Sequence, residues 1–457
     1  MPAAAPVADA AARRERESAS AAAGARRGAA AVPGLPMSPG AGIGVGAEGA
    51  PPFALPGEHF AAGMVWLLLG SAGLVAVAPL LALGGFTAPR VVAVVHCFTL
   101  GWLTTSIFGA LYQLFPVALG VPARSVRRGH VTFWLLQAGV LALVAGFWWW
   151  SPPLLGLGWV LLVGAVWGLA SNLLPQRRRA PRGRLMGWYV AGAHLGIGLA
   201  MLVAAARIGN LLGWWEVDAL RLLATHVHLA ALGFGTLTVV GVGSRLLPMF
   251  LLSHGHAEWP LRWIGPLVGA GLVAFGVGEL AGVPAAAAAG ALLMAAGVAL
   301  YLYQAWEYFR RRVRRVLDPG LALAAVAHGF LGLALVLGLA LALRGVAEPR
   351  LVGAYGVAAI LGWLALLVAG IYHKILPFLT WLHRFGTRVG EEGLPRVAEL
   401  TVRSWGWASV ALLGGGTLLL AASVALGLPH AARAAAVLVA TGAAVMGAQG
   451  VRLVSLR

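Results

Sequence analysis

Long apolar runs follow one another through most of the chain and are separated by short polar segments. Most runs have about 20 residues or more, enough for a helix that crosses the hydrocarbon core of a bilayer. A helix also satisfies its own backbone hydrogen bonds in lipid. The pattern therefore predicts an all-α polytopic membrane protein with about twelve transmembrane helices. We expect the spans at 60–83, 90–119, 130–150, 153–174, 187–208, 219–252, 261–281, 284–309, 320–343, 351–381, 400–426 and 430–455.

The second, sixth and tenth predicted helices are unusually long and share a sequence pattern. Residues 96–116 read HCFTLGWLTTSIFGALYQLFP, residues 228–248 read HLAALGFGTLTVVGVGSRLLP, and residues 357–377 read VAAILGWLALLVAGIYHKILP. The first two begin with histidine, the third has Val357 at that place, and all three end in proline. A repeat about every 130 residues predicts three pseudo-symmetric four-helix units. Their expected bounds are 58–186, 187–318 and 319–457, which together form one transmembrane domain.

Charge is unevenly distributed along the 457 residues. Residues 1–57 are rich in Ala, Gly, Pro and Arg and have no apolar run, which predicts a disordered basic tail. Arginines also gather in the loops after the second, fourth, eighth and tenth spans, so the positive-inside rule places both termini in the cytoplasm of a bacterial inner membrane. The net charge of +18 then reflects topology, and no nucleic-acid partner is expected. A single cysteine excludes a multi-cysteine metal site within this chain.

Histidines within the predicted spans are the leading candidates for chemistry, because polar side chains are costly in a membrane and usually have a function there. His96 and His228 occupy matching places about two turns into long helices, in the expected outer half of the bilayer. His226 lies two residues before His228 and should point to roughly the opposite side of its helix. Neutral imidazole is a ligand for heme iron and for copper. We predict His96, His226 and His228 as cofactor ligands, with His226 and His228 as candidates for a metal. A hydrogen bond across a helix interface is the alternative.

A second polar layer is expected towards the cytoplasmic side. His59, His194 and His328 are 135 and 134 residues apart on the first helix of each unit, and hydrogen bonding between helices is the leading interpretation for this set. The long helices carry a matching row of polar residues nearer their ends. This row comprises Gln113, Arg245 and Lys374, with His373 beside the last. We expect these side chains to be structural or to form a proton or anion path.

Twelve helices in three units, with histidines on the second and sixth helices, resemble subunit I of the heme–copper oxidase superfamily. The openings HCFTLGW and HVHLAALGF also resemble the NnrS group of nitric-oxide-response membrane proteins. The resemblance implies hemes between the long helices. It matches His96 to the low-spin heme ligand, and His228 or His226 to the copper ligand on the sixth helix.

The chain departs from the oxidases at three places. The tenth helix lacks the His-x-His pair expected near Val357, and the seventh span, at 261–281, contains no histidine. Leu232 stands where the oxidases have a tyrosine one turn after the sixth-helix histidine. A standard oxygen-reducing, proton-pumping centre therefore cannot be assembled from these residues.

The leading functional hypothesis is a divergent heme-binding membrane protein, with or without copper, that acts in redox chemistry or in handling nitric oxide or oxygen. A redox partner protein or a small gas ligand is the expected partner, besides the lipid bilayer. The alternative is a transporter or channel that uses Gln113, Arg245 and Lys374 as a substrate path, since internal repeats are also typical of transporters. A regulatory or assembly protein with a vestigial site is the third hypothesis.

Overall fold

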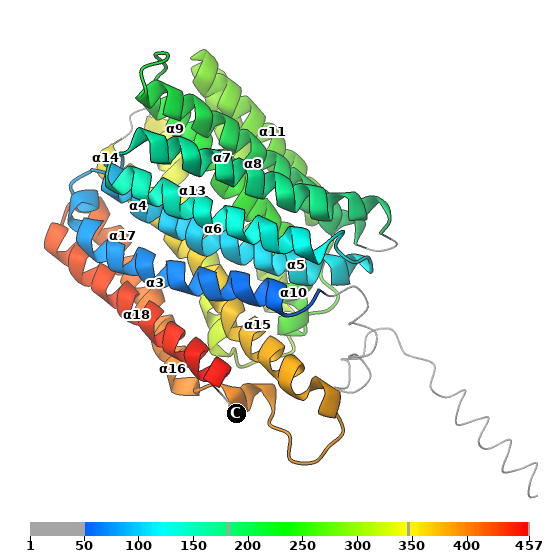
Figure 1. Cartoon of the computed structure of the whole chain (residues 1–457). Coiled ribbons are helices and arrows are strands. Elements are labelled where there is room, and N and C mark those ends of the chain that lie inside the picture. The colour runs from blue at the N-terminus through cyan, green and yellow to red at the C-terminus, as the bar shows by residue number, and fades with distance from the viewer. Residues whose placement is uncertain (1–50, 181–182, 345–347, 456–457) are drawn as a thin grey trace, which may run out of the picture. The chain divides into compact units, whose positions relative to one another are not determined.

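The computed structural model describes residues 51–180, 183–344 and 348–455. Within these ranges, twelve helices are long and apolar enough to cross a membrane, which confirms the predicted all-α class and number of spans. Figure 1 shows them as one bundle, in which the first span, α3, lies beside the last, α18. Residues 1–50 of the predicted disordered tail lie outside the described residues.

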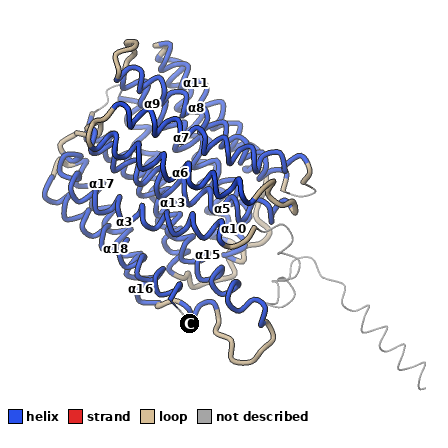
Figure 2. The backbone as a smooth tube through the Cα atoms, viewed as in Figure 1, coloured by secondary structure: helices blue, strands red, loops and turns tan. Residues whose placement is uncertain are grey.

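Eight spans are single α-helices, and four are divided by a π-helix. The single helices are α3 (Ala54–Ala82), α6 (Val126–Trp148), α7 (Pro152–Leu173), α8 (Arg184–Leu211), α11 (Pro260–Ala281), α12 (Pro284–Arg310), α13 (Pro319–Arg344) and α18 (Pro429–Ser455). In the eleventh span, α16 (Arg403–Ser409) continues through the π-helix η7 (Val410–Gly414) into α17 (Gly415–Ala425), and the other three divided spans are the long ones. Short 3₁₀ turns occur at η2 (Leu174–Arg178), η5 (Gly386–Arg388) and η6 (Val397–Leu400). Loops occupy only the ends of the bundle (Figure 2).

Proline and glycine mark many of the helix ends. Seven of the described helices begin with proline, whose missing N–H would have no partner within the first turn in any case. Gly120 and Gly282 end α5 and α11 with φ values of 68°, a left-handed conformation that glycine adopts without a Cβ penalty. These signals explain why most predicted boundaries agree with the structure to within a few residues.

The start of the first span is an exception. We expected it at residue 60, after a tail that ends at 57, but α3 begins at Ala54. Pro56 and Gly57 resemble a helix break in the sequence. Proline is nevertheless tolerated in the first turn of a helix, and Leu55 is fully buried. Packing of Leu55 therefore extends the helix beyond the predicted boundary.

Each long helix consists of an α-helix, a π-helix and a second α-helix. The second span comprises α4 (Pro89–His96), η1 (Cys97–Thr104) and α5 (Thr105–Leu119). The sixth comprises α9 (Ala219–His228), η3 (Leu229–Thr236) and α10 (Leu237–Leu251), and the tenth comprises α14 (Pro349–Gly356), η4 (Val357–Ala365) and α15 (Leu366–Phe385). The π-helices begin at matching places in the three repeated stretches. The grouping into three four-helix units stays a prediction.

The π-helices meet in the middle of the bundle, where η4 contacts both η1 and η3. Trp102 of η1 is fully buried, and its indole N–H donates to the carbonyl of Ala365 at 3.4 Å. Trp363 of η4 is 1% exposed and donates to the Thr236 hydroxyl of η3 at 3.1 Å. Two indoles thus connect the three long helices at the centre.

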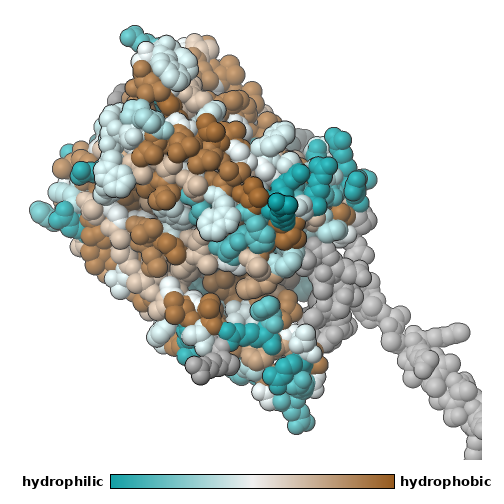
Figure 3. Space-filling view, viewed as in Figure 1, coloured by the Kyte–Doolittle hydropathy of each residue, from teal (hydrophilic) through white to brown (hydrophobic). Residues whose placement is uncertain are grey.

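The surface of the bundle is typical of a protein embedded in lipid. Large apolar side chains, including Trp134, Trp167 and Leu195, are more than 60% exposed. Figure 3 shows hydrophobic residues over the flank, with hydrophilic residues gathered towards the ends. Because successive spans run in opposite directions, the loops with most arginines share one end, called here the arginine-rich end. They lie between α5 and α6, α7 and α8, α12 and α13, and α15 and α16.

Candidate functional site

His96 is the last residue of α4, immediately before the π-helix η1. Its Nδ1 lies 2.8 Å from the carbonyl oxygen of Val92, one turn earlier. A carbonyl can only accept, so Nδ1 carries the proton and Nε2 keeps its lone pair in the neutral ring. The ring stacks on Phe147 of α6, with a centroid distance of 5.3 Å and an interplanar angle of 13°. The backbone and Phe147 therefore fix the orientation of a ring whose Nε2 is available to a ligand.

His226 and His228 lie on α9 and point to different neighbours, as predicted from their spacing. Nδ1 of His226 donates to the Ala200 carbonyl of α8 at 3.0 Å. Nδ1 of His228 donates to the Ala224 carbonyl at 2.8 Å, and its Nε2 accepts from the Tyr355 hydroxyl of α14 at 3.2 Å. His226 therefore keeps an Nε2 without a bond to any described residue, whereas His228 already uses both nitrogens.

Of the three candidate ligands, His96 and His226 lie within electrostatic range of each other and of the Arg207 guanidinium of α8. His228 instead packs against Phe275 of α11 at a centroid distance of 4.7 Å. His96 and His226 are both partly exposed. We refer to His96 and His226 as the histidine pair.

The copper site predicted at His226 and His228 stays a prediction. In the part of the chain that the structure describes, no three His, Cys, Asp or Glu side chains form a group that could hold a metal ion. Cys97 follows His96, but its Cβ faces Gly70 of α3. A copper ion at His226 or His228 would therefore have no third such side chain beside it among the described residues, whereas two imidazoles from different helices suffice as protein donors to a heme.

Arg207 is a residue that sequence reasoning missed. It lies in the last turns of α8, and its guanidinium donates to the Ala219 carbonyl at the start of α9 at 2.6 Å. A charged residue inside the apolar run MLVAAARIGNLL was a signal in the sequence. Its proximity to the histidine pair depends on how α8 packs on α9, which no local pattern reveals. Tyr355 was missed for the same reason.

Close helix contacts identify matching positions on the three helices that precede the long ones. On each long helix, a glycine in the π-helix approaches the preceding helix so closely that a Cβ would collide with it or nearly so. The contacts pair Gly101 with Trp66 of α3, Gly233 with Gly196 of α8, and Gly362 with Phe330 of α13. Trp66, Gly196 and Phe330 are therefore equivalent in packing.

We expected His59, His194 and His328 to occupy equivalent positions on their helices, and this prediction is wrong for His59. His194 and His328 each lie two residues before their matching positions, but the equivalent residue on α3 is Met64. His59 lies five residues away from Met64, about 7.5 Å along a helix. Spacing alone could not show this, because the helices are offset by different numbers of residues. His328 also lies beside Trp363 of η4, at the middle of the bundle and not towards the end of α13.

These three histidines nevertheless share one local geometry. In each, Nδ1 donates at 2.7 Å to the carbonyl four residues earlier. Nε2 of His328 pairs with the Tyr301 hydroxyl of α12 at 3.2 Å, which agrees with the predicted bonding between helices. Nε2 of His59 and of His194 is buried without a partner among the described residues. Neither belongs to the histidine pair.

The residues of the inner row differ in their surroundings, and their role as a proton or anion path stays a prediction. Lys374 of α15 is paired with Asp318, which precedes α13, at 2.6 Å. Burial alone would raise the pKa of Asp318, but the hydrogen bond and the charge of Lys374 outweigh it and leave the pKa below its usual range. Arg245 is exposed, and Gln113 is partly buried. His373 lies beside Lys374, and its Nε2 has no partner among the described residues.

Comparison with models of known protein families and with curated proteins finds no match for this chain.

Proposed function

We propose that this protein is a divergent heme-binding integral membrane protein, similar to subunit I of the heme–copper oxidases and to the NnrS group. The observation that carries the proposal is the histidine pair. His96 and His226 come from two long helices, and each has its Nδ1 bonded to a backbone carbonyl. That bond orients the ring and makes Nε2 a better ligand, as it does in metal sites generally.

The histidine pair would hold the heme between α4 and α9. Arg207 supplies a positive charge beside the pair, which suits the carboxylates of heme propionates. Arg245 and Lys374 do not serve this contact in the proposal, because Arg245 is exposed and Lys374 is bonded to Asp318. His228 has a different role in this proposal, because its Nε2 is bonded to Tyr355.

A bound heme supplies an iron that exchanges one electron. The surrounding residues favour this redox role over gas binding, because His96 and His226 would both be engaged in holding the heme. Phe147 stacks on His96 and keeps it in place. A redox partner protein would exchange electrons at the end of the bundle opposite the arginine-rich end. By the positive-inside rule, the arginine-rich end and the two termini would face the cytoplasm, and the membrane would be a bacterial inner membrane.

The test is a dithionite-reduced minus oxidised absorption spectrum of the detergent-purified protein, with iron and copper analysis of the same sample. We expect heme bands and one iron per chain. The bands should be lost in His96→Ala and His226→Ala. They should persist in His430→Ala, which removes an exposed histidine at the start of α18. A protein expressed with ample heme that contains no iron would refute the proposal.

The transport hypothesis has one supporting observation, the half-buried ion pair of Lys374 and Asp318 next to His373. It predicts solute flux in proteoliposomes without any cofactor, and loss of that flux in Lys374→Ala. A cofactor-free protein with flux would favour transport. A cofactor-free protein without flux would favour the third hypothesis, a regulatory or assembly protein.

A further inference from the structure

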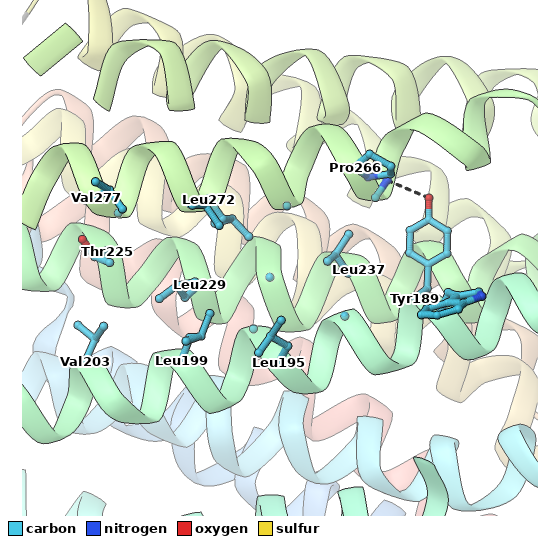
Figure 4. A pocket seen from close by; sticks show the side chains of 18 of the residues that line it. Tyr189, Leu195, Leu199, Val203, Thr225, Leu229, Leu237, Pro266, Leu272 and Val277 are labelled. Carbon is cyan, nitrogen blue, oxygen red and sulfur yellow. Dashed lines mark hydrogen bonds between the residues drawn. The ribbon is translucent and has the colours of Figure 1, made fainter. Parts of the chain in front are cut away.

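A long apolar groove runs along the outside of the bundle between α8 and α11. Its volume is about 710 Å³, and its floor is formed by α9, η3 and α10. Figure 4 shows Leu195 and Leu199 on one wall, Leu229 on the floor, and Leu272 and Val277 on the other wall. Neither residue of the histidine pair lines the groove.

The groove extends over most of the depth of a membrane. Its lining on α8 runs from Leu185 to Val203, and on α11 from Leu261 to Leu280. At 1.5 Å per residue these stretches are about 27 Å long, close to the hydrocarbon thickness of a bilayer of about 30 Å. A molecule that fills the groove would therefore extend through one leaflet of the bilayer and into the other.

The two walls are joined at the arginine-rich end. The Tyr189 hydroxyl of α8 donates to the Leu261 carbonyl at 2.6 Å and accepts from the Gly265 N–H at 3.1 Å (Figure 4). The next residue, Pro266, has no N–H to bond within α11. These bonds hold α8 and α11 together at one end of the groove, so the fold fixes the position of its two walls.

Positive charge lies at the same end. Arg262 lines the groove directly and is exposed. Arg177, at the end of η2, lies 4.7 Å from the ring centroid of Trp188, a residue of the groove wall that is 68% exposed. Basic pockets between transmembrane helices on the cytoplasmic side bind anionic lipid headgroups, and exposed tryptophans are typical of the headgroup level. The groove thus combines an apolar channel with a basic mouth.

The chemistry of the lining favours a lipid over a protein helix. The walls and floor are almost entirely apolar, and Arg262, at one end, is the only charged residue in the lining. An apolar length with one cation at its end matches an acyl chain that carries a phosphate group.

We propose that the groove binds one anionic phospholipid. An acyl chain lies along α8 and α11, and the phosphate group contacts Arg262 at the arginine-rich end, with Arg177 nearby. The lipid covers Thr225 and Leu229, which are neighbours of His226 and His228 on α9. The site is independent of the proposed heme function.

The test is native mass spectrometry of the full detergent-purified chain, titrated with dioleoyl phosphatidylglycerol or with dioleoyl phosphatidylcholine. The first phosphatidylglycerol should bind at least about fivefold more tightly than phosphatidylcholine, the preference expected for one arginine near a headgroup. Arg262→Gln should remove this preference. Arg403→Gln, which alters an exposed arginine at the start of α16, is the matched control and should retain it.

A second pair of variants tests the acyl channel. A Cβ at Gly269 meets open space in the groove, so Gly269→Phe fills the channel without displacing protein atoms. A Cβ at the exposed Gly329 of α13 also meets open space, but outside the groove, so Gly329→Phe is the control. Gly269→Phe should lose the tight lipid, and Gly329→Phe should keep it. Equal binding of the two lipids, equal behaviour of the two variants, or a dimer that Gly269→Phe dissociates would overturn the proposal.

Discussion

The contact between α8 and η3 allows a sharp test of the fold, because two neighbouring glycines on α8 differ only in what lies beside them. A Cβ at Gly196 would lie 2.6 Å from the carbonyl carbon and 2.7 Å from the carbonyl oxygen of Gly233. Carbon atoms in favourable contact are about 3.5–4.0 Å apart, so the two helices would have to separate by about 1 Å. No flexible side chain is available to move instead. A Cβ at Gly198 meets open space.

Gly196→Ala should therefore be less stable than Gly198→Ala by about 1–3 kcal/mol, the usual cost of overpacking a well-packed interior. The gain in helix propensity, up to about 1 kcal/mol, is common to both variants and cancels in the comparison. Thermal unfolding of both purified variants in the same detergent, together with unfolding in sodium dodecyl sulfate, measures the difference. Equal stability of the two variants would show that α8 and η3 do not approach as closely as this structure describes.

Three further outcomes follow from the contacts of single residues. His226→Gly should lose the heme bands and regain them with added imidazole, whereas His228→Ala should keep them; the reverse result would restore His228 as the ligand. Tyr355→Phe should cost about 0.6 kcal/mol, the average for a hydrogen bond between membrane helices, and leave the spectrum unchanged; a spectral shift would contradict this assignment. Because its folded pKa is lowered, Asp318 stabilises the protein above its unfolded pKa of about 3.9, and this contribution is lost as pH falls through the folded pKa. The melting temperature of the wild type should therefore fall more steeply below about pH 4 than that of Asp318→Asn, and parallel curves would refute the coupling.

The class of fold and the number of spans could be predicted from the sequence because the bilayer imposes a length and a composition on every spanning helix. The opposite directions of His226 and His228 followed from helical geometry alone. Their partners did not, because Ala200 and Tyr355 lie 26 and 127 residues away along the chain. Packing between distant helices decided which histidine pairs with His96.

The correction at His59 illustrates the limit of spacing arguments. The regular intervals between His59, His194 and His328 suggested equivalence, but the packing of Trp66, Gly196 and Phe330 shows an offset of five residues on the first helix. Each of these histidines is followed four residues later by a glycine, but in a chain with 64 glycines such a match carries little information. A contact between backbones carries much more, since it can be made at only one register.

The π-helices of the three long spans show whether this backbone conformation serves the packing of the helices or the candidate site. η1 and η3 follow His96 and His228, which invites the interpretation that the π-helix serves a ligand, since π-helical turns are frequent at functional sites. The tenth span, however, has Val357 at the matching place and still contains the π-helix η4. The feature that all three share is a glycine against the preceding helix followed by an aromatic ring at the centre. The π-helix therefore serves the packing of the long helices, and the histidines use a backbone that exists without them.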